Sequence, residues 1–101
     1  MLTNEQLIDE LYNFITNDYD LYRQRLEPIY KNLCKKHDKN IYDEEKSQHL
    51  FENVVREGRK KYVSMFGVKY NVNVNNFNPL IVKEIAELIR NNFEQNIDNY
   101  F

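Results

Sequence analysis

Three side chains in this sequence could serve as soft metal ligands or in nucleophilic chemistry: Cys34, His37 and His49. Cys34 and His37 are one helical turn apart, but a structural zinc site needs four ligands, usually in two well-spaced pairs, and the second pair is missing. A cysteine or serine nucleophile needs a positioned base, and neither Ser47 nor Ser64 lies in a glycine-flanked turn. We therefore expect no metal, no cofactor and no enzymatic activity.

The chain is poor in glycine and proline, with two of each among 101 residues. All-β folds need many such turn residues, so this scarcity favours long helices. Two glycines also cannot build a phosphate-binding loop. The length suits one hydrophobic core. The sequence therefore predicts one all-α domain over residues 1–101, a single compact bundle of four helices.

Neither a secretory signal nor a membrane span is expected. The first 22 residues hold five acidic side chains and no Lys or Arg, unlike a signal peptide, and no apolar run approaches the roughly 18 residues of a membrane helix. Asn, Lys and Ile are abundant while Ala is scarce, which is typical of an AT-rich bacterial or phage genome. We expect a soluble cytoplasmic protein that does not bind a membrane.

Capping residues and apolar spacing define the first two expected helices. The first begins after Thr3, whose side chain suits a capping box with Gln6. The second carries apolar side chains at one-turn spacing on both sides of Pro28. A proline inside a helix removes a hydrogen bond and clashes with the preceding turn, so we expect a continuous second helix that is kinked at Pro28.

The third expected helix has the clearest pattern, with Asp43 as its N-cap and a long apolar stripe from Leu50 to Phe66 that includes Met65. Gly58 falls on this stripe. Glycine is unfavourable inside a helix, so its position predicts a close crossing with a neighbouring helix. Gly67 is expected to end the third helix.

Residues 68–77 break the helical period and alternate apolar with polar side chains. This stretch predicts an extended loop packed on the helices or, alternatively, an edge strand that pairs with another chain. Asn78 and Pro79 then suit the cap and first position of the fourth helix.

The formal net charge of −2 hides an uneven distribution. Residues 1–22 carry five acids and no bases, whereas residues 23–69 carry twelve bases and seven acids. The basic side of the second and third helices predicts a nucleic-acid-binding face. Its six candidate residues are Lys35, Lys36, Arg56, Arg59, Lys60 and Lys61. Alternatively, the acidic first helix folds against this segment and neutralises it.

The sequence is also rich in aromatic residues, with eight tyrosines and six phenylalanines. Tyrosine is enriched at the centres of protein interfaces, so aromatic and apolar residues off the predicted core faces suggest a partner surface. Its six candidate residues are Tyr42, Tyr70, Val72, Val74, Tyr100 and Phe101. We expect this surface to bind a host or phage protein, or to join copies of this chain into a homo-oligomer.

Three segments carry a family resemblance: residues 22–36, 42–67 and 77–93. They include a Tyr-Asp-x-Glu-Lys helix start, a Leu-Phe pair, and Lys-Lys-Tyr ahead of a glycine. In these motifs the chain resembles a family of small, mostly uncharacterised helical proteins of tailed phages and their bacterial hosts. It departs from that family at Asn78, which separates phenylalanine from proline, and in lacking glycines over 68–77. The resemblance implies a phage accessory protein and brings no known activity.

These features together lead us to expect a small non-enzymatic accessory protein that acts by protein–protein contact. Host takeover and inhibition of a host defence system are both compatible with this role. Two alternatives stay open. The chain could be a nucleic-acid-binding module that uses the basic side of helices two and three, or a minor virion or homo-oligomeric structural component.

Overall fold

Side-chain caps set the helix starts in the computed structural model, which describes residues 2–99. Helix α1 (Asn4–Asn17) begins with a reciprocal capping box between Thr3 and Gln6. In α5 (Pro79–Gln95), the amide of Ile81 donates a hydrogen bond to the Asn78 side chain at 3.0 Å. Both starts confirm the sequence-based expectation, because a cap depends only on residues within the same turn.

The second helix is continuous from residue 19 to residue 38, but it changes its winding on the way. It consists of α2 (Tyr19–Leu21), the π-helical segment η1 (Tyr22–Leu26) and α3 (Glu27–Asp38). The amide of Glu27 donates to the carbonyl of Tyr22, five residues earlier. Pro28 lies in the first turn of α3, where its missing N–H is tolerated. The continuous helix is confirmed, and its irregularity is a π turn directly before the proline.

Helix α4 (Glu44–Tyr70) is the longest element, with 27 residues or about 40 Å of axis. The expectation that Gly67 ends it is wrong, because the helix continues to Tyr70 and closes at Asn71 in the left-handed region, at φ 53°. The amide of Val72 donates back to the carbonyl of Gly67 at 2.9 Å. A Cβ on Gly67 would lie 2.8 Å from the Val72 carbonyl oxygen. The glycine therefore lets the chain fold back over the helix end.

Replacing Asn71 with alanine should lower the free energy of unfolding by about 1 kcal/mol, because alanine pays the steric penalty of the left-handed conformation. Asn71→Gly should be neutral or slightly stabilising. Urea unfolding followed by circular dichroism measures both. Equal stability of the two variants would contradict this role for Asn71.

The connection from α4 to α5 is a short loop that contains the 3-10 turn η2 (Val74–Asn76). No strand occurs among the described residues, so the loop expectation is confirmed in shorter form and the strand alternative is not observed. Val72 and Phe77 are buried in the core. A last 3-10 turn, η3 (Ile97–Asn99), follows α5.

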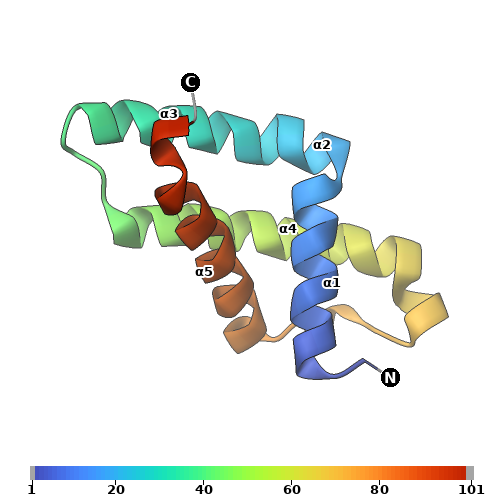
Figure 1. Cartoon of the computed structure of the whole chain (residues 1–101). Helices are drawn as coiled ribbons and strands as arrows, with labels where there is room; N and C mark the ends of the chain where they lie inside the picture. Colours follow the sequence, from blue (N-terminus) through green and yellow to red (C-terminus); the bar gives the residue numbers. More distant parts are fainter. Residues whose placement is uncertain (1, 100–101) are drawn as a thin grey trace.

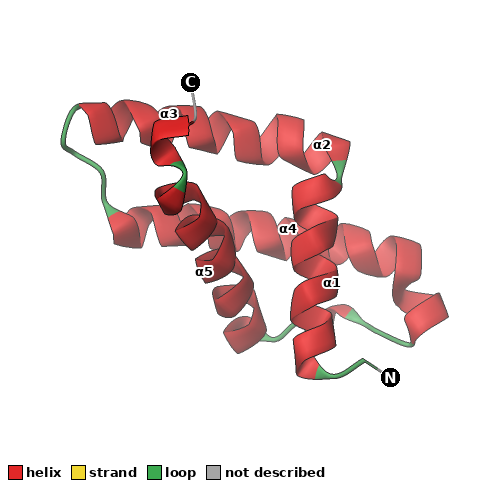
Figure 2. Ribbon diagram, in the orientation of Figure 1, coloured by secondary structure: helices red, strands yellow, loops and turns green. Residues whose placement is uncertain are grey.

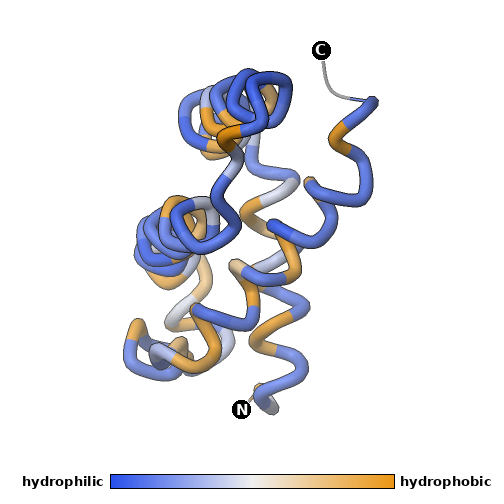
Figure 3. The backbone as a smooth tube through the Cα atoms, turned by 90° about the vertical axis from the view of Figure 1, so that its left-hand side faces the viewer, coloured by the Kyte–Doolittle hydropathy of each residue, from blue (hydrophilic) through white to orange (hydrophobic). Residues whose placement is uncertain are grey.

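The helices form two layers. The α2–η1–α3 helix and α4 run antiparallel beside each other, and α1 and α5 cross over them (Figure 1). Figure 2 shows that loops join the helices throughout, and Figure 3 shows apolar and hydrophilic stretches alternating along each helix, as one-sided burial requires. The four-helix bundle predicted from the sequence is confirmed.

The crossing of α1 over α4 is unusually close at Gly58. A Cβ built on Gly58 would lie 2.6 Å from Cγ1 and 2.8 Å from Cδ1 of Ile15, which is fully buried. Non-bonded carbon atoms do not approach so closely, so only glycine at position 58 leaves room for the Ile15 side chain. The close crossing predicted at Gly58 is confirmed.

Candidate interaction surface

Two of the six predicted nucleic-acid-binding residues are held by other parts of the chain. Arg59 donates from Nη1 to the carbonyl oxygen of Phe77 at 2.8 Å, and its Nε is buried without a hydrogen-bond partner. This contact ties α4 to the connection before α5. Lys61 pairs with Asp18 at 2.9 Å. Both cations therefore stabilise the fold.

Of the remaining four cations, Lys35 and Lys36 lie on α3, whereas Arg56 and Lys60 lie on α4. Arg56 pairs with Glu52 on its own helix at 3.5 Å, while Lys35 and Lys60 are exposed and Lys36 is half-buried. The ion pairs Lys61–Asp18 and Arg25–Glu57 set residues 56–61 beside α2 and η1. Lys35 lies ten residues beyond Arg25 along the helix, or about 15 Å. The structure thus separates the two basic groups along the bundle.

Lys61 forms an ion-pair clamp between α4 and the start of α2. Its Nζ lies 2.9 Å from Oδ1 of Asp18 and 3.7 Å from Oδ2 of Asp20. Asp18 is also the N-cap of α2, accepting a hydrogen bond from the Leu21 amide. Partial burial opposes ionisation of Asp18, but the hydrogen bonds from Leu21 and Lys61 outweigh it and lower its pKa. Part of the acidic N-terminal segment thus neutralises the basic segment.

Asp18→Asn should remove the clamp while keeping the cap, because asparagine is an equally good N-cap. A carboxyl whose pKa is lowered by folding stabilises the protein above its ordinary pKa of 3.8 and loses that contribution as pH falls toward the folded pKa. We expect Asp18→Asn to lower the free energy of unfolding by up to about 1 kcal/mol at neutral pH, and this loss should shrink as the pH falls below the ordinary pKa of aspartate. Urea unfolding across this pH range measures it.

The matched control is Asp9→Asn, since Asp9 is an exposed acid on α1. The free energy of unfolding of this variant should depend on pH as that of the wild type does. If the free energy of unfolding of Asp18→Asn fell at acid pH as steeply as that of the wild type, the clamp would be contradicted.

Tyr42, predicted to face a partner, is engaged within the protein. Its hydroxyl donates to Oε2 of Glu94 at 2.7 Å, and its ring lies beside that of Phe93, with centroids 6.5 Å apart. Burial, followed by the nearby Glu94 carboxylate, raises the pKa of Tyr42 to about 12. Tyr42 therefore anchors the α3–α4 connection to α5.

Three of the other predicted partner residues, Tyr70, Val72 and Val74, lie at or just after the end of α4. Tyr70 is half-buried, with its ring 6.0 Å from that of Phe66 and the Lys69 ammonium 5.4 Å from its centroid. Val72 is buried and Val74 half-buried, so Val72 is a core residue in this conformation. Tyr100 and Phe101 lie outside the described residues.

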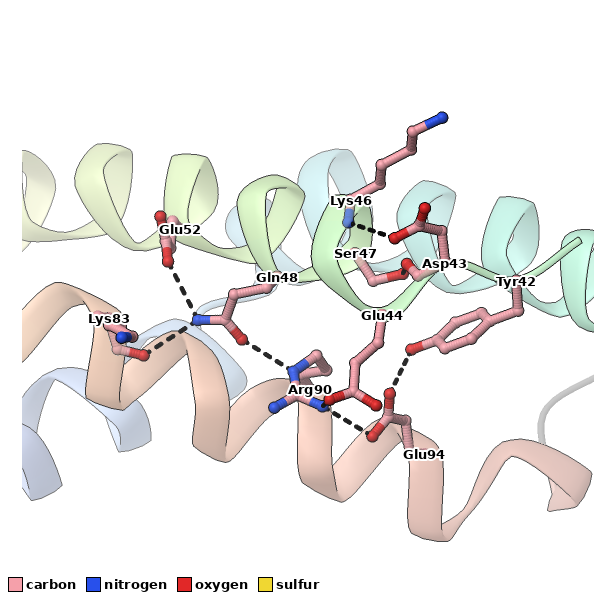
Figure 4. A network of polar contacts seen from close by, with 10 residues as sticks. All are labelled: Tyr42, Asp43, Glu44, Lys46, Ser47, Gln48, Glu52, Lys83, Arg90 and Glu94. Carbon is pink, nitrogen blue, oxygen red and sulfur yellow. Dashed lines mark hydrogen bonds and ion pairs between the residues drawn. The ribbon is translucent and has the colours of Figure 1, made fainter.

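A polar network joins the start of α4 to α5 (Figure 4). Arg90, whose side chain is 12% exposed, is its centre. It pairs with Glu94 at 2.9 Å and Glu44 at 3.0 Å, and its Nε donates to Gln48 at 2.8 Å. Gln48 in turn donates to the Lys83 carbonyl at 3.2 Å. In the sequence, only the four-residue spacing of Arg90 and Glu94 hints at this network.

An open groove of about 450 Å³ lies beside this network and is lined by four glutamates together with Lys83, Arg90 and His49. Its glutamates do not converge: within residues 2–99, no three His, Cys, Asp or Glu side chains are placed to share a metal ion. Arg90, which lines the groove, is already paired with carboxylates. We therefore interpret the groove as the exposed side of the structural network around Arg90.

Cys34 lacks the environment of an activated thiol. Burial, followed by the negative charge of Asp38, raises the pKa of its thiol. A nucleophilic cysteine needs the opposite shift, which cationic neighbours or a helix N-terminus provide.

The last turns of α4 extend beyond the start of α2, at the right in Figure 1, and exposed apolar side chains occur on both elements. Tyr19 is 73% exposed, Met65 57% and Val68 fully exposed. Tyr19 stands between the two carboxylates that bind Lys61, Met65 follows Lys61 by one helical turn, and Val68 lies three residues further on. We call Tyr19, Met65 and Val68 the end surface.

The end surface was not predicted from the sequence. Met65 was assigned to the core stripe of the third helix, which is wrong because α4 extends past the start of α2. Only the position of Tyr19 off a predicted core face hinted at exposure.

Comparisons with family models, curated proteins and solved structures find no match to this chain. Over the described residues, no helix combines the length and the apolar character needed to cross a bilayer.

Proposed function

We propose that this protein is a small non-enzymatic accessory protein of phage type that acts by binding another protein, as in takeover of host machinery or inhibition of a host defence system. The end surface is the observation that carries this proposal. It exposes a tyrosine, a methionine and a fully exposed valine at one end of the bundle. Tyrosine and methionine are enriched in interface cores, and covering all three side chains would release water from apolar surface.

The end surface is held rigid by interactions on both of its helices. The Lys61 clamp fixes the start of α2 against α4, and the rings of Phe14 and Tyr70 pack on Phe66. A preformed surface loses little conformational entropy on binding. Steric occlusion of a partner's site is therefore the mechanism that this proposal favours.

The division of the basic residues weakens the nucleic-acid alternative. A phosphate backbone is bound by several free cations along one face. Here Arg59 and Lys61 are committed to internal contacts, and Lys35 lies about 15 Å along the bundle from the basic part of α4.

Site-specific photocrosslinking tests the proposal. A photoreactive residue at position 68 should crosslink a discrete protein from the bacterium that carries or hosts the gene. The matched control is position 80, because Leu80 is 77% exposed at the start of α5. The same species at both positions, crosslinks to nucleic acid alone, or crosslinks only between copies of this chain would each contradict the proposal.

A further inference from the structure

We propose that the end surface binds an acidic segment of its partner protein, one that places large apolar side chains on Tyr19, Met65 and Val68 and carboxylates against the cations around them. This inference rests on the proposed function and specifies the chemistry of the partner. Three observations support it: the end surface itself forms an apolar centre, exposed cations lie beside it as a positive border, and the nearby acidic side chains are already paired with cations of this chain.

The apolar centre consists of three exposed side chains from two helices. Val68 is fully exposed and Met65 is 57% exposed on the same side of α4, with Tyr19 contributed by α2. Methionine adapts its shape to different partners, and a tyrosine adds apolar area together with a hydroxyl. Such centres, rimmed by polar groups, supply most of the binding energy of protein interfaces.

Exposed cations border this centre. The Arg23 guanidinium lies 5.9 Å from the centre of the Tyr19 ring and 3.8 Å from Oε2 of Glu27, and its side chain is 56% exposed. Lys60 precedes the clamp lysine, and Lys69 follows Val68; both are exposed. Their positive charge favours carboxylates on the approaching partner.

The acids of this region are already engaged. Asp18 is bound by Lys61 and the Leu21 amide, and Asp20 lies 3.7 Å from the same lysine. Glu57 pairs with Arg25. Of the five bases over residues 56–69, Arg56, Arg59 and Lys61 are engaged within the protein, so the exposed Lys60 and Lys69 supply the positive charge that α4 adds to this border.

An acidic protein segment fits this surface better than a nucleic acid does. Protein–nucleic acid interfaces are polar and strongly charged throughout, whereas the end surface consists of three exposed apolar or aromatic side chains, of which Val68 is the most exposed. A phosphate backbone would leave Met65 and Val68 uncovered. A segment that alternates carboxylates with leucine-like or aromatic side chains satisfies both the centre and the border.

Selection from a displayed library of random 12-residue peptides tests the inference. Peptides are selected on the full chain and counter-selected on Met65→Ser/Val68→Ser, which removes the apolar centre from exposed positions. We expect the enriched peptides to combine net negative charge with at least two large apolar residues. Their affinity should fall by about tenfold or more in the serine variant and by about threefold in Lys60→Gln/Lys69→Gln. The control Leu80→Ser should leave it unchanged.

The outcomes separate the two proposals. Enrichment of neutral or basic peptides that depend on Met65 and Val68 overturns the acidic partner while leaving protein binding at the end surface intact. Equal binding of polyglutamate, or tighter binding of single-stranded DNA, shows that charge alone acts and also overturns it. If no selected peptide depends on Met65 and Val68, the inference fails, and failed crosslinking from position 68 then rejects the proposed function as well.

Discussion

Gly58→Val is expected to lower the free energy of unfolding by about 3 kcal/mol, the upper end of the range for overpacked cores. The new side chain would occupy the place of Ile15, since even its Cβ would lie 2.6 Å from Cγ1 of that residue. Cδ1 of Leu21 lies in van der Waals contact with this Cβ position, at 3.7 Å, so the two methyl groups of valine would find no free space beside it. Helices α1 and α4 would have to separate, which uncovers the buried side chains between them. Urea unfolding followed by circular dichroism measures the loss.

A double-mutant cycle with alanine isolates the steric cause. Gly58→Ala alone should destabilise the protein by about 1–2 kcal/mol, although alanine is favoured over glycine in a helix by about 1 kcal/mol. In an Ile15→Ala background the same substitution should become stabilising, because the obstructing side chain is gone and helix propensity remains. A stabilising Gly58→Ala in both backgrounds would refute the close crossing.

Features that depend on neighbouring residues in the chain were predictable from the sequence. The caps at Thr3, Asp43 and Asn78 form as expected, because each needs only a side-chain oxygen and an amide within one turn. Gly58 was also predictable, since an unfavourable residue on an apolar stripe needs a packing reason. Periodicity in this chain reports which side of a helix is buried.

Features that depend on where distant helices end were not predictable. The apolar stripe of α4 continues through Met65, but α2 begins opposite Lys61, so the face beyond it is left uncovered. Gly67 resembled a helix end, although a left-handed Asn71 performs that role. Likewise, the sequence suggested that the basic residues of the middle segment form one group. The ion pairs of the structure instead place residues 56–61 beside α2 and η1, away from Lys35 and Lys36.

Arg90→Met should lower the free energy of unfolding by about 2 kcal/mol, because it leaves charged and polar groups of the α4–α5 network without their shared donor. Glu94 would keep only the hydroxyl of Tyr42 as a partner from the contacts in Figure 4. The methionine retains most of the apolar stem, so the loss isolates the guanidinium. Thermal and urea unfolding measure the change.

Arg56→Met provides the matched control, since Arg56 forms an ion pair on the same fold but with its side chain 47% exposed, against 12% for Arg90. Exposed pairs contribute little, so its loss should stay below about 0.5 kcal/mol. Glu94→Gln keeps an acceptor for Tyr42 and removes the charge, and in that background Arg90→Met should cost less than in the wild type. Equal losses for the two arginine variants would show that the network adds no more than a surface ion pair, and α4 would then be joined to α5 by apolar packing alone.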